Sequence, residues 1–244
     1  MERFAISAKP VAPNVVYHAG GLRLSLITPR LLRVEKGSIT DLATQCVWNR
    51  DLGKINWEFE DLGDTCRVCT GEATFAVEKK TGTVISVTLP DGSTVTDFKK
   101  DNLLGTARTL DMANGAVKLE QGILSRSGAS IMDDSKSLLI DGQGKILPRP
   151  ACTDSYCFAY GRDYRQQLRD FFRLTGPVPL IPKYALSNWW SRYKAYTQEE
   201  YRNLMQTFID KKLPVTVATI DMDWHWTDVI KRFGKAAERE RGKQ

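Results

Sequence analysis

The sequence predicts an antiparallel β-sandwich followed by the opening of an α/β domain. In residues 15–146, short strand-like segments alternate with turn signals, and helical periodicity is almost absent. After Pro150 an amphipathic helix follows. The chain then shows a strand, a helix and a second strand, which is the order of a parallel β-α-β unit.

Three segments of the first region carry the alternation of apolar and polar residues typical of a half-buried strand. They are residues 22–27, residues 73–78 and, less regularly, residues 84–89. Between such segments lie residues that favour tight turns, as in Pro90-Asp91-Gly92. Many short strands at this spacing favour a sandwich over residues 1–150.

A linking helix is expected next, because residues 164–174 carry four apolar side chains near one face. These are Leu168, Phe171, Phe172 and Leu174. Gly176 and Pro177 then end the helix, and further prolines make a stiff connection. We therefore expect a linking helix and proline-rich connector at 151–182, the start of an α/β domain at 183–230 and a charged tail at 231–244.

The α/β part begins with an aromatic-rich strand at residues 184–190. Thr197 and Glu200 have the spacing of a capping box at the start of a helix, and Pro214 ends that helix. Residues 215–220 form a β-branched second strand. Because a right-handed crossover makes the two strands parallel, their carboxyl ends meet at one edge, where we expect the site.

Composition and charge exclude several classes of protein. The chain has 244 residues, of which 42% are hydrophobic and 26% charged, as in a soluble globular protein. No apolar run approaches the ~18 residues of a membrane span, and the N-terminus lacks the apolar core of a secretion signal. Five cysteines are an odd number and are expected to be reduced. We therefore expect a cytoplasmic protein without a membrane partner.

The net charge of +6 does not indicate a nucleic-acid partner, because it is concentrated at one end of the chain. Residues 230–244 contain six basic and two acidic residues, so the rest of the chain carries only +2. No basic stripe with interleaved aromatic residues runs through the predicted domains. A function of this tail in binding an acidic surface remains an alternative.

The strand at 215–220 ends in a cluster of side chains suited to a polar ring-shaped ligand. The cluster contains Asp221, Asp223, Trp224, His225 and Trp226. Carboxylates accept hydrogen bonds from sugar hydroxyls, and aromatic faces cover the C–H patches of a pyranose. The alternative is a polar strand end whose tryptophans only fill the core.

Trp189 and Trp190 end the preceding strand, so we expect Trp190 and Asp221 to lie side by side. Neighbouring residues of a strand point to opposite faces. One of the two tryptophans is therefore expected to pack against the helix that begins near Thr197.

Several motifs in sequence order resemble glycoside hydrolase family 31, the α-glucosidase and α-xylosidase family. They are residues 102–111, 122–128, 160–164, 174–186, 188–193 (Asn-Trp-Trp-Ser-Arg-Tyr) and 220–225 (Ile-Asp-Met-Asp-Trp-His). The resemblance covers about residues 15–229. It implies a galactose-mutarotase-like β-sandwich followed by the first β/α units of an incomplete (β/α)8 TIM barrel. It also implies a retaining exo-α-glycosidase that acts on α-linked glucosides or xylosides and needs no metal or organic cofactor.

The same resemblance implies roles for individual residues. Asp221 corresponds to an aspartate that binds the terminal sugar in the innermost subsite, Trp190 to an aromatic residue that lines this subsite, and Asp111 to a nearby aspartate of the sandwich. Asp223 and His225 receive only neighbouring roles. The nucleophile and the acid/base belong to later strands, since a barrel takes ~250 residues and only 62 follow from Lys183 onward. No catalytic residue is assigned within the chain, which alone is expected to bind sugar weakly without turnover.

Other interpretations have less support. A non-catalytic carbohydrate-binding or interaction module is the main alternative. The tail from Gly234 onward carries no family motif and resembles a frameshifted or truncated end, although a natural variant would look the same. Cys66 and Cys69 have the spacing of half a zinc site, but an odd separation in a strand sends the thiols to opposite faces, so no metal site is predicted.

Overall fold

The computed structural model describes residues 8–105 and 112–222. The chain forms two compact units, Met1–Val178 and Pro179–Gln244. We call them the N-terminal unit and the C-terminal unit, and each is described by itself. Among the described helices, none combines the length and the apolar character that crossing a bilayer requires.

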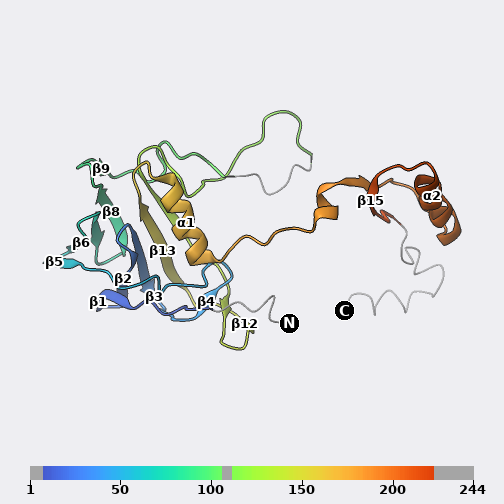
Figure 1. Ribbon diagram of the computed structural model, residues 1–244. Coiled ribbons are helices and arrows are strands. Elements are labelled where there is room, and N and C mark those ends of the chain that lie inside the picture. Colours follow the sequence, from blue (N-terminus) through green and yellow to red (C-terminus); the bar gives the residue numbers. More distant parts are fainter. Residues whose placement is uncertain (1–7, 106–111, 223–244) are drawn as a thin grey trace. The chain divides into compact units, whose positions relative to one another are not determined.

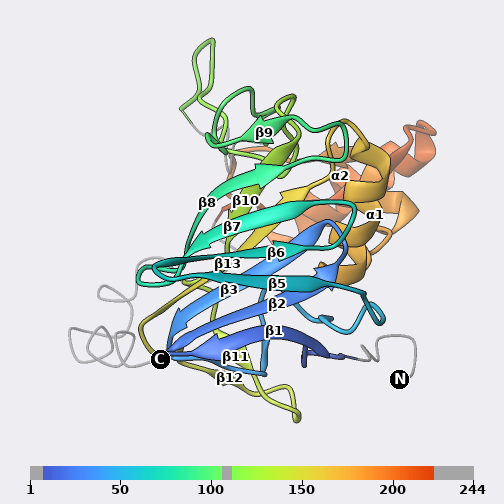
Figure 2. The same ribbon diagram turned by 90° about the vertical axis from the view of Figure 1, so that its left-hand side faces the viewer.

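The N-terminal unit is built on two five-stranded sheets in which all neighbouring strands are antiparallel (Figures 1 and 2). The first sheet has the order β1 (Asn14–Ala19), β2 (Leu22–Thr28), β3 (Leu31–Gly37), β13 (Cys152–Ala159) and β10 (Ala129–Asp133). The second has the order β5 (Glu58–Leu62), β6 (Thr65–Cys69), β7 (Thr74–Glu78), β8 (Thr83–Thr88) and β9 (Thr94–Val95). A small third sheet joins β12 (Ile146–Leu147), β11 (Leu139–Ile140) and β4 (Ala43–Thr44).

The two large sheets share one hydrophobic core. Leu24 and Val34 of the first sheet belong to the same buried cluster as Val68, Phe75 and Val87 of the second. In β7 buried residues alternate with more exposed ones, as its sequence predicts. In β8 the buried residues are Val84 and Val87, so the alternation is less regular there. The prediction of antiparallel strands in the first part of the chain is therefore confirmed.

Strand β2 differs from the prediction, because all seven of its residues are buried rather than every second one. Its outer face is covered as well as its inner face. A second apolar cluster on that outer side joins Phe158 of the sheet to Leu174 and Phe171. The polar residues Arg23 and Ser25 are buried there.

The expected boundary at residue 150 lies too early. Strand β13 pairs with β3 over seven residues and lies between β3 and β10, so it is part of the first sheet. Helix α1 (Tyr164–Thr175) packs on this sheet, with the rings of Phe158 and Phe171 6.4 Å apart (Figure 1). The N-terminal unit therefore continues to Val178.

Helix α1 begins and ends as predicted, but its buried face is different. Asp163 caps its N-terminus, and Gly176 ends it at a φ of 92°, a conformation that favours glycine. Gln167 and Asp170 are buried beside Leu174, whereas Phe172 is exposed. Polar side chains can occupy these buried positions because they find hydrogen-bond partners there. Gln167, for example, donates to the carbonyl of Ile123.

The C-terminal unit contains a 3₁₀ helix (Lys183–Leu186), β14 (Asn188–Trp190), α2 (Gln198–Asp210) and β15 (Val215–Ala218) (Figure 1). Strands β14 and β15 are parallel, which confirms the predicted β-α-β order. The capping box of α2 is formed by Thr197 and Glu200, as predicted. The first strand is shorter than expected, because residues 184–186 lie in the 3₁₀ helix.

Candidate functional site

The carboxyl ends of β14 and β15 lie side by side and continue beyond the strands. The backbone N–H of Thr219 donates to the carbonyl of Trp190 at 2.8 Å. Further along, Ala195 and Met222 form a parallel bridge. Asp221 lies between these two contacts and is exposed. The structure thus places Asp221 at the shared end of two parallel strands, where the sequence predicts a site.

Trp190 packs against α2. Its ring meets Phe208 edge to face at a centroid distance of 4.9 Å. Its indole nitrogen is buried and has no hydrogen-bond partner in the described part of the chain. This contact fits the expectation that one of the two adjacent tryptophans packs against the helix. The role of Trp190 in lining a sugar subsite stays a prediction.

Trp189 is the tryptophan that β14 leaves available to a ligand. Its side chain is 57% exposed, and its indole N–H donates to the carbonyl of Ala185 at 3.0 Å. Strand alternation predicts that the two neighbours point to opposite faces. Which of the two packs against the helix depends on the rotation of the strand, which nothing in the sequence gives.

Tyr201 fixes the backbone next to Asp221, a role that the sequence analysis missed. Its hydroxyl donates to the carbonyl of Thr219 at 2.8 Å, and its ring packs against Tyr196 at 5.3 Å. Burial raises the pKa of Tyr201, so the hydroxyl keeps its proton and remains a donor. The first turn of α2 therefore anchors the residue that lies two positions before Asp221.

Asp111, the aspartate of the sandwich that the resemblance places near the sugar, lies outside the described residues. The base of the loop that carries it is described. Asn102 joins the two sides of that base. Its Oδ1 accepts hydrogen bonds from the N–H groups of Leu104 and Gly122 at 2.8 and 2.9 Å, and its Nδ2 donates to the carbonyl of Gly122 at 2.8 Å. The motifs at 102–111 and 122–128 are thus brought together at their ends.

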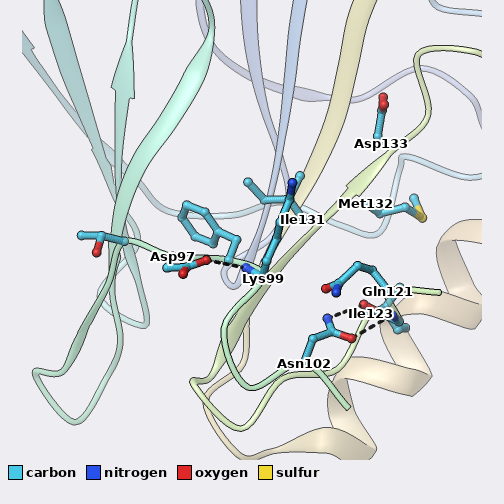
Figure 3. A pocket seen from close by; sticks show the side chains of 11 residues that line it. Asp97, Lys99, Asn102, Gln121, Ile123, Ile131, Met132 and Asp133 are labelled. Carbon is cyan, nitrogen blue, oxygen red and sulfur yellow. Dashed lines mark hydrogen bonds between the residues drawn. The ribbon is translucent and has the colours of Figure 1, made fainter. Parts of the chain in front are cut away.

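A cavity of about 660 Å³ adjoins this loop base (Figure 3). Phe98, Ile123 and Ile131 give it an apolar part, while Lys99 and Gln121 add polar groups. Such a lining can hold a ligand with one apolar face and polar edges. Local sequence patterns do not predict this cavity, since its residues come from three separate segments.

The two remaining candidates, Asp223 and His225, lie outside the described residues. Within the described ranges, no group of three or more His, Cys, Asp or Glu side chains is placed to hold a metal ion. Cys66 is buried and Cys69 is half-buried on strand β6, and both are free thiols.

Comparison with known proteins identifies the region that contains Asp221. Residues 178–237 match the sequence model described as "Glycosyl hydrolases family 31 TIM-barrel domain". This region is similar to the barrel domain of glycosyl hydrolase family 31. Alpha-glucosidase 2 of Bacillus thermoamyloliquefaciens is 36% identical over 83 residues, which are 30% of this chain and 10% of that protein. Alpha-xylosidase of Saccharolobus solfataricus is 22% identical over 236 residues, 93% of this chain and 30% of that one.

Solved structures of GH31 enzymes share the fold of this chain. A GH31 α-xylosidase from a soil metagenome, complexed with xylose, aligns with a TM-score of 0.57 at 13% identity, covering 92% of this chain and 42% of that one. The GH31 dextranase of Flavobacterium johnsoniae, complexed with glucose, aligns with a TM-score of 0.53 at 16% identity, covering 89% and 34%. The matches thus cover between 10% and 42% of the length of these relatives.

Proposed function

We propose that this chain supplies the sugar-binding N-terminal part of a retaining exo-α-glycosidase that acts on α-glucosides or α-xylosides. In this proposal the two-sheet unit is the family's β-sandwich, and β14, α2 and β15 are the first elements of its (β/α)8 barrel. The observation that carries the proposal is the position of Asp221, exposed at the joint carboxyl end of two parallel strands in the segment that matches the family barrel.

Asp221 has the chemistry of a residue that holds a terminal sugar. An ionised carboxylate has two oxygens that accept hydrogen bonds from adjacent hydroxyl groups. The Tyr201 bond to Thr219 and the bridge between Ala195 and Met222 restrain the backbone on both sides of it. A restrained carboxylate orients a ligand at a lower entropy cost than a mobile one.

Turnover requires two further carboxylates, one that attacks the anomeric carbon and one that protonates the leaving group and later activates water. The family resemblance assigns both to later strands and neither to residues 1–244. We therefore propose that Asp221 binds and orients the sugar, while the bond-breaking groups come from outside this chain. The isolated chain then binds sugar weakly and hydrolyses nothing.

Calorimetry of the full chain with glucose and xylose tests the binding step. We expect weak binding that Asp221→Ala reduces at least tenfold, since the variant loses the acceptor oxygens. Glu199→Ala, which removes another exposed carboxylate of the same unit, is the matched control and is expected to leave the affinity unchanged. Sugar binding whose affinity is unchanged by Asp221→Ala would instead favour a non-catalytic carbohydrate-binding module.

Hydrolysis of nitrophenyl α-glucoside and α-xyloside by the pure chain tests the second step. No release of nitrophenol is expected. Release that follows the protein through purification would contradict the assignment of the catalytic carboxylates to later strands.

A further inference from the structure

A second polar depression, of about 410 Å³, lies in the N-terminal unit. Four separate segments form it: the turn between β2 and β3, the turn between β6 and β7, the loop at residues 52–55, and helix α1 with the residues just before it. The described part of the chain gives it no role in the function proposed above.

The floor of the depression is a rigid chain of hydrogen bonds. Thr28 and Tyr160 join their hydroxyls at 2.9 Å, and Tyr160 donates to Oδ2 of Asp170 at 2.8 Å. All three residues are buried. Burial raises the pKa of Tyr160, so its hydroxyl stays protonated and the direction of the chain is fixed.

Ion pairs hold the walls. The Arg30 guanidinium donates from Nε to Glu72 at 2.6 Å and from Nη1 to Asp163 at 3.2 Å. On α1, Arg173 donates to Oδ1 of Asp170 at 2.9 Å, and its second Nη donates to the carbonyl of Leu52 at 3.1 Å. Side chains held by such bonds lose little further freedom when a ligand binds.

The charges of the lining cancel. Arg30, Lys54 and Arg173 supply three positive charges, and Glu72, Asp163 and Asp170 supply three negative ones. A site without net charge offers no long-range attraction to an anion or a cation. This balance favours a neutral ligand.

Donors and acceptors remain available on these fixed side chains. Within the described ranges, Oε1 of Glu72 and Oε1 of Gln166 accept no hydrogen bond, because their partners use Oε2 and Nε2. Nη2 of Arg30 likewise donates none. A hydroxyl group both donates and accepts. Adjacent hydroxyls of a sugar therefore match a wall that presents both kinds of atom.

We propose that this depression is a second carbohydrate site, which binds a neutral oligosaccharide without contributing to its cleavage. The choice of a sugar among neutral polyhydroxyl ligands rests on the proposed function. The site itself uses residues of the N-terminal unit only and does not depend on Asp221.

Calorimetry of the full chain with isomaltotriose, carried out in the Asp221→Ala background, isolates this site. We expect Glu72→Gln to weaken the remaining binding at least fivefold, because it removes an anionic acceptor and weakens the hold on Arg30. Gln166→Ala is a second variant with the same expected direction. Glu60→Gln is the matched control, since Glu60 is another exposed carboxylate of the second sheet that pairs with an arginine, Arg67, at 3.3 Å.

The outcomes separate the two proposals. Binding that survives Asp221→Ala and falls with Glu72→Gln supports the second site, even if Asp221 proves irrelevant. Equal affinities of the Glu72→Gln and Glu60→Gln variants, or no binding at all in the Asp221→Ala background, would overturn it. Binding of glucose 6-phosphate tenfold tighter than that of glucose would overturn the assignment to a neutral ligand.

Discussion

At the scale of single residues, the most unusual feature is a buried network of charges on the outer face of the first sheet. Arg33 is fully buried and donates to both carboxylate oxygens of Asp154, at 2.9 and 2.7 Å. Arg149 donates to Oδ2 of Asp154, and Glu35 lies 3.0 Å from Arg33. Asp154 is therefore the carboxylate that links two buried guanidinium groups.

Asp154→Asn is expected to lower the free energy of unfolding by about 3 kcal/mol, because it removes the carboxylate charge that two buried guanidinium groups share. Asp61→Asn is the control. It removes an exposed ion pair with Lys79 and is expected to leave the free energy of unfolding nearly unchanged. Urea denaturation of the full chain measures the free energy of unfolding of both variants. Equal decreases would show that the buried network stabilises the fold no more than the exposed ion pair does.

The pH dependence of this effect has a defined sign. Burial alone would raise the pKa of Asp154, but the hydrogen bonds and charge of Arg33 lower it below its usual range. A lowered folded pKa gives stability that is complete above the ordinary value of about 4 and is lost as the pH falls through the folded value. We expect the stability gap between the wild type and Asp154→Asn to narrow below about pH 4 in urea titrations.

Asp134 provides the opposite case in the same network. Burial raises the pKa of Asp134, so its ionised form destabilises the fold at neutral pH. Relative to Asp134→Asn, the wild type is expected to gain stability as the pH falls through that raised value. As the pH falls, the stability of the wild type should therefore fall relative to Asp154→Asn and rise relative to Asp134→Asn. Changes of the same sign for both comparisons would contradict the assigned pKa shifts.

At the scale of elements, the C-terminal unit depends on the cap of α2. Thr197 accepts the N–H of Glu200, whose carboxylate accepts the N–H of Thr197 at 2.8 Å. Thr197→Ala is expected to cost about 1 kcal/mol and to speed amide exchange in α2 about fivefold. Thr207→Ala, on the same helix, is the control and should not speed it, since its hydroxyl only bonds back to Asn203. Hydrogen exchange monitored by NMR makes the comparison.

The base of the loop that carries Asp111 depends on a close backbone approach at Gly122. A Cβ there would lie 2.8 Å from the carbonyl oxygen of Leu104. We expect Gly122→Ala to lower the free energy of unfolding by about 1–3 kcal/mol, the range for a forced backbone shift. At Gly142 a Cβ meets nothing within 4 Å, so Gly142→Ala is the matched control in thermal unfolding.

Elements with strong local signals were predictable from the sequence. The start and end of α1 follow from Asp163 and Gly176, and α2 from its capping box. Strand β13 was missed because it lies after the change in composition at Pro150, although it pairs with β3 at the centre of the first sheet. Local patterns do not show which distant strand supplies a partner, nor which face of β14 meets the helix.

At the scale of the whole molecule, the C-terminal unit leaves much apolar surface exposed. Leu186 is 72% exposed, Ile209 67% and Ile220 56%, and within the described residues α2 has no fully buried side chain. The two parallel strands form a sheet of their own, with no further strand paired to it in the described chain. Exposed strand edges and apolar side chains promote association.

Sedimentation velocity is therefore expected to show association that increases with concentration. Leu186→Lys should reduce it by placing a charge on this surface. Leu62→Lys is the control and should leave the association unchanged, because it changes a 43% exposed position of the N-terminal unit. A monodisperse monomer at all concentrations would contradict this prediction.

The most direct test of the account is a titration of the isotope-labelled full chain with glucose, followed by ¹H–¹⁵N NMR. The account predicts shifts that saturate at residues 219–222 and at the indole N–H of Trp189, while the indole N–H of Trp190, packed on α2, stays in place. Saturating shifts confined to other parts of the chain, with residues 219–222 unmoved, would contradict the central claim that Asp221 holds a sugar at the end of the paired strands.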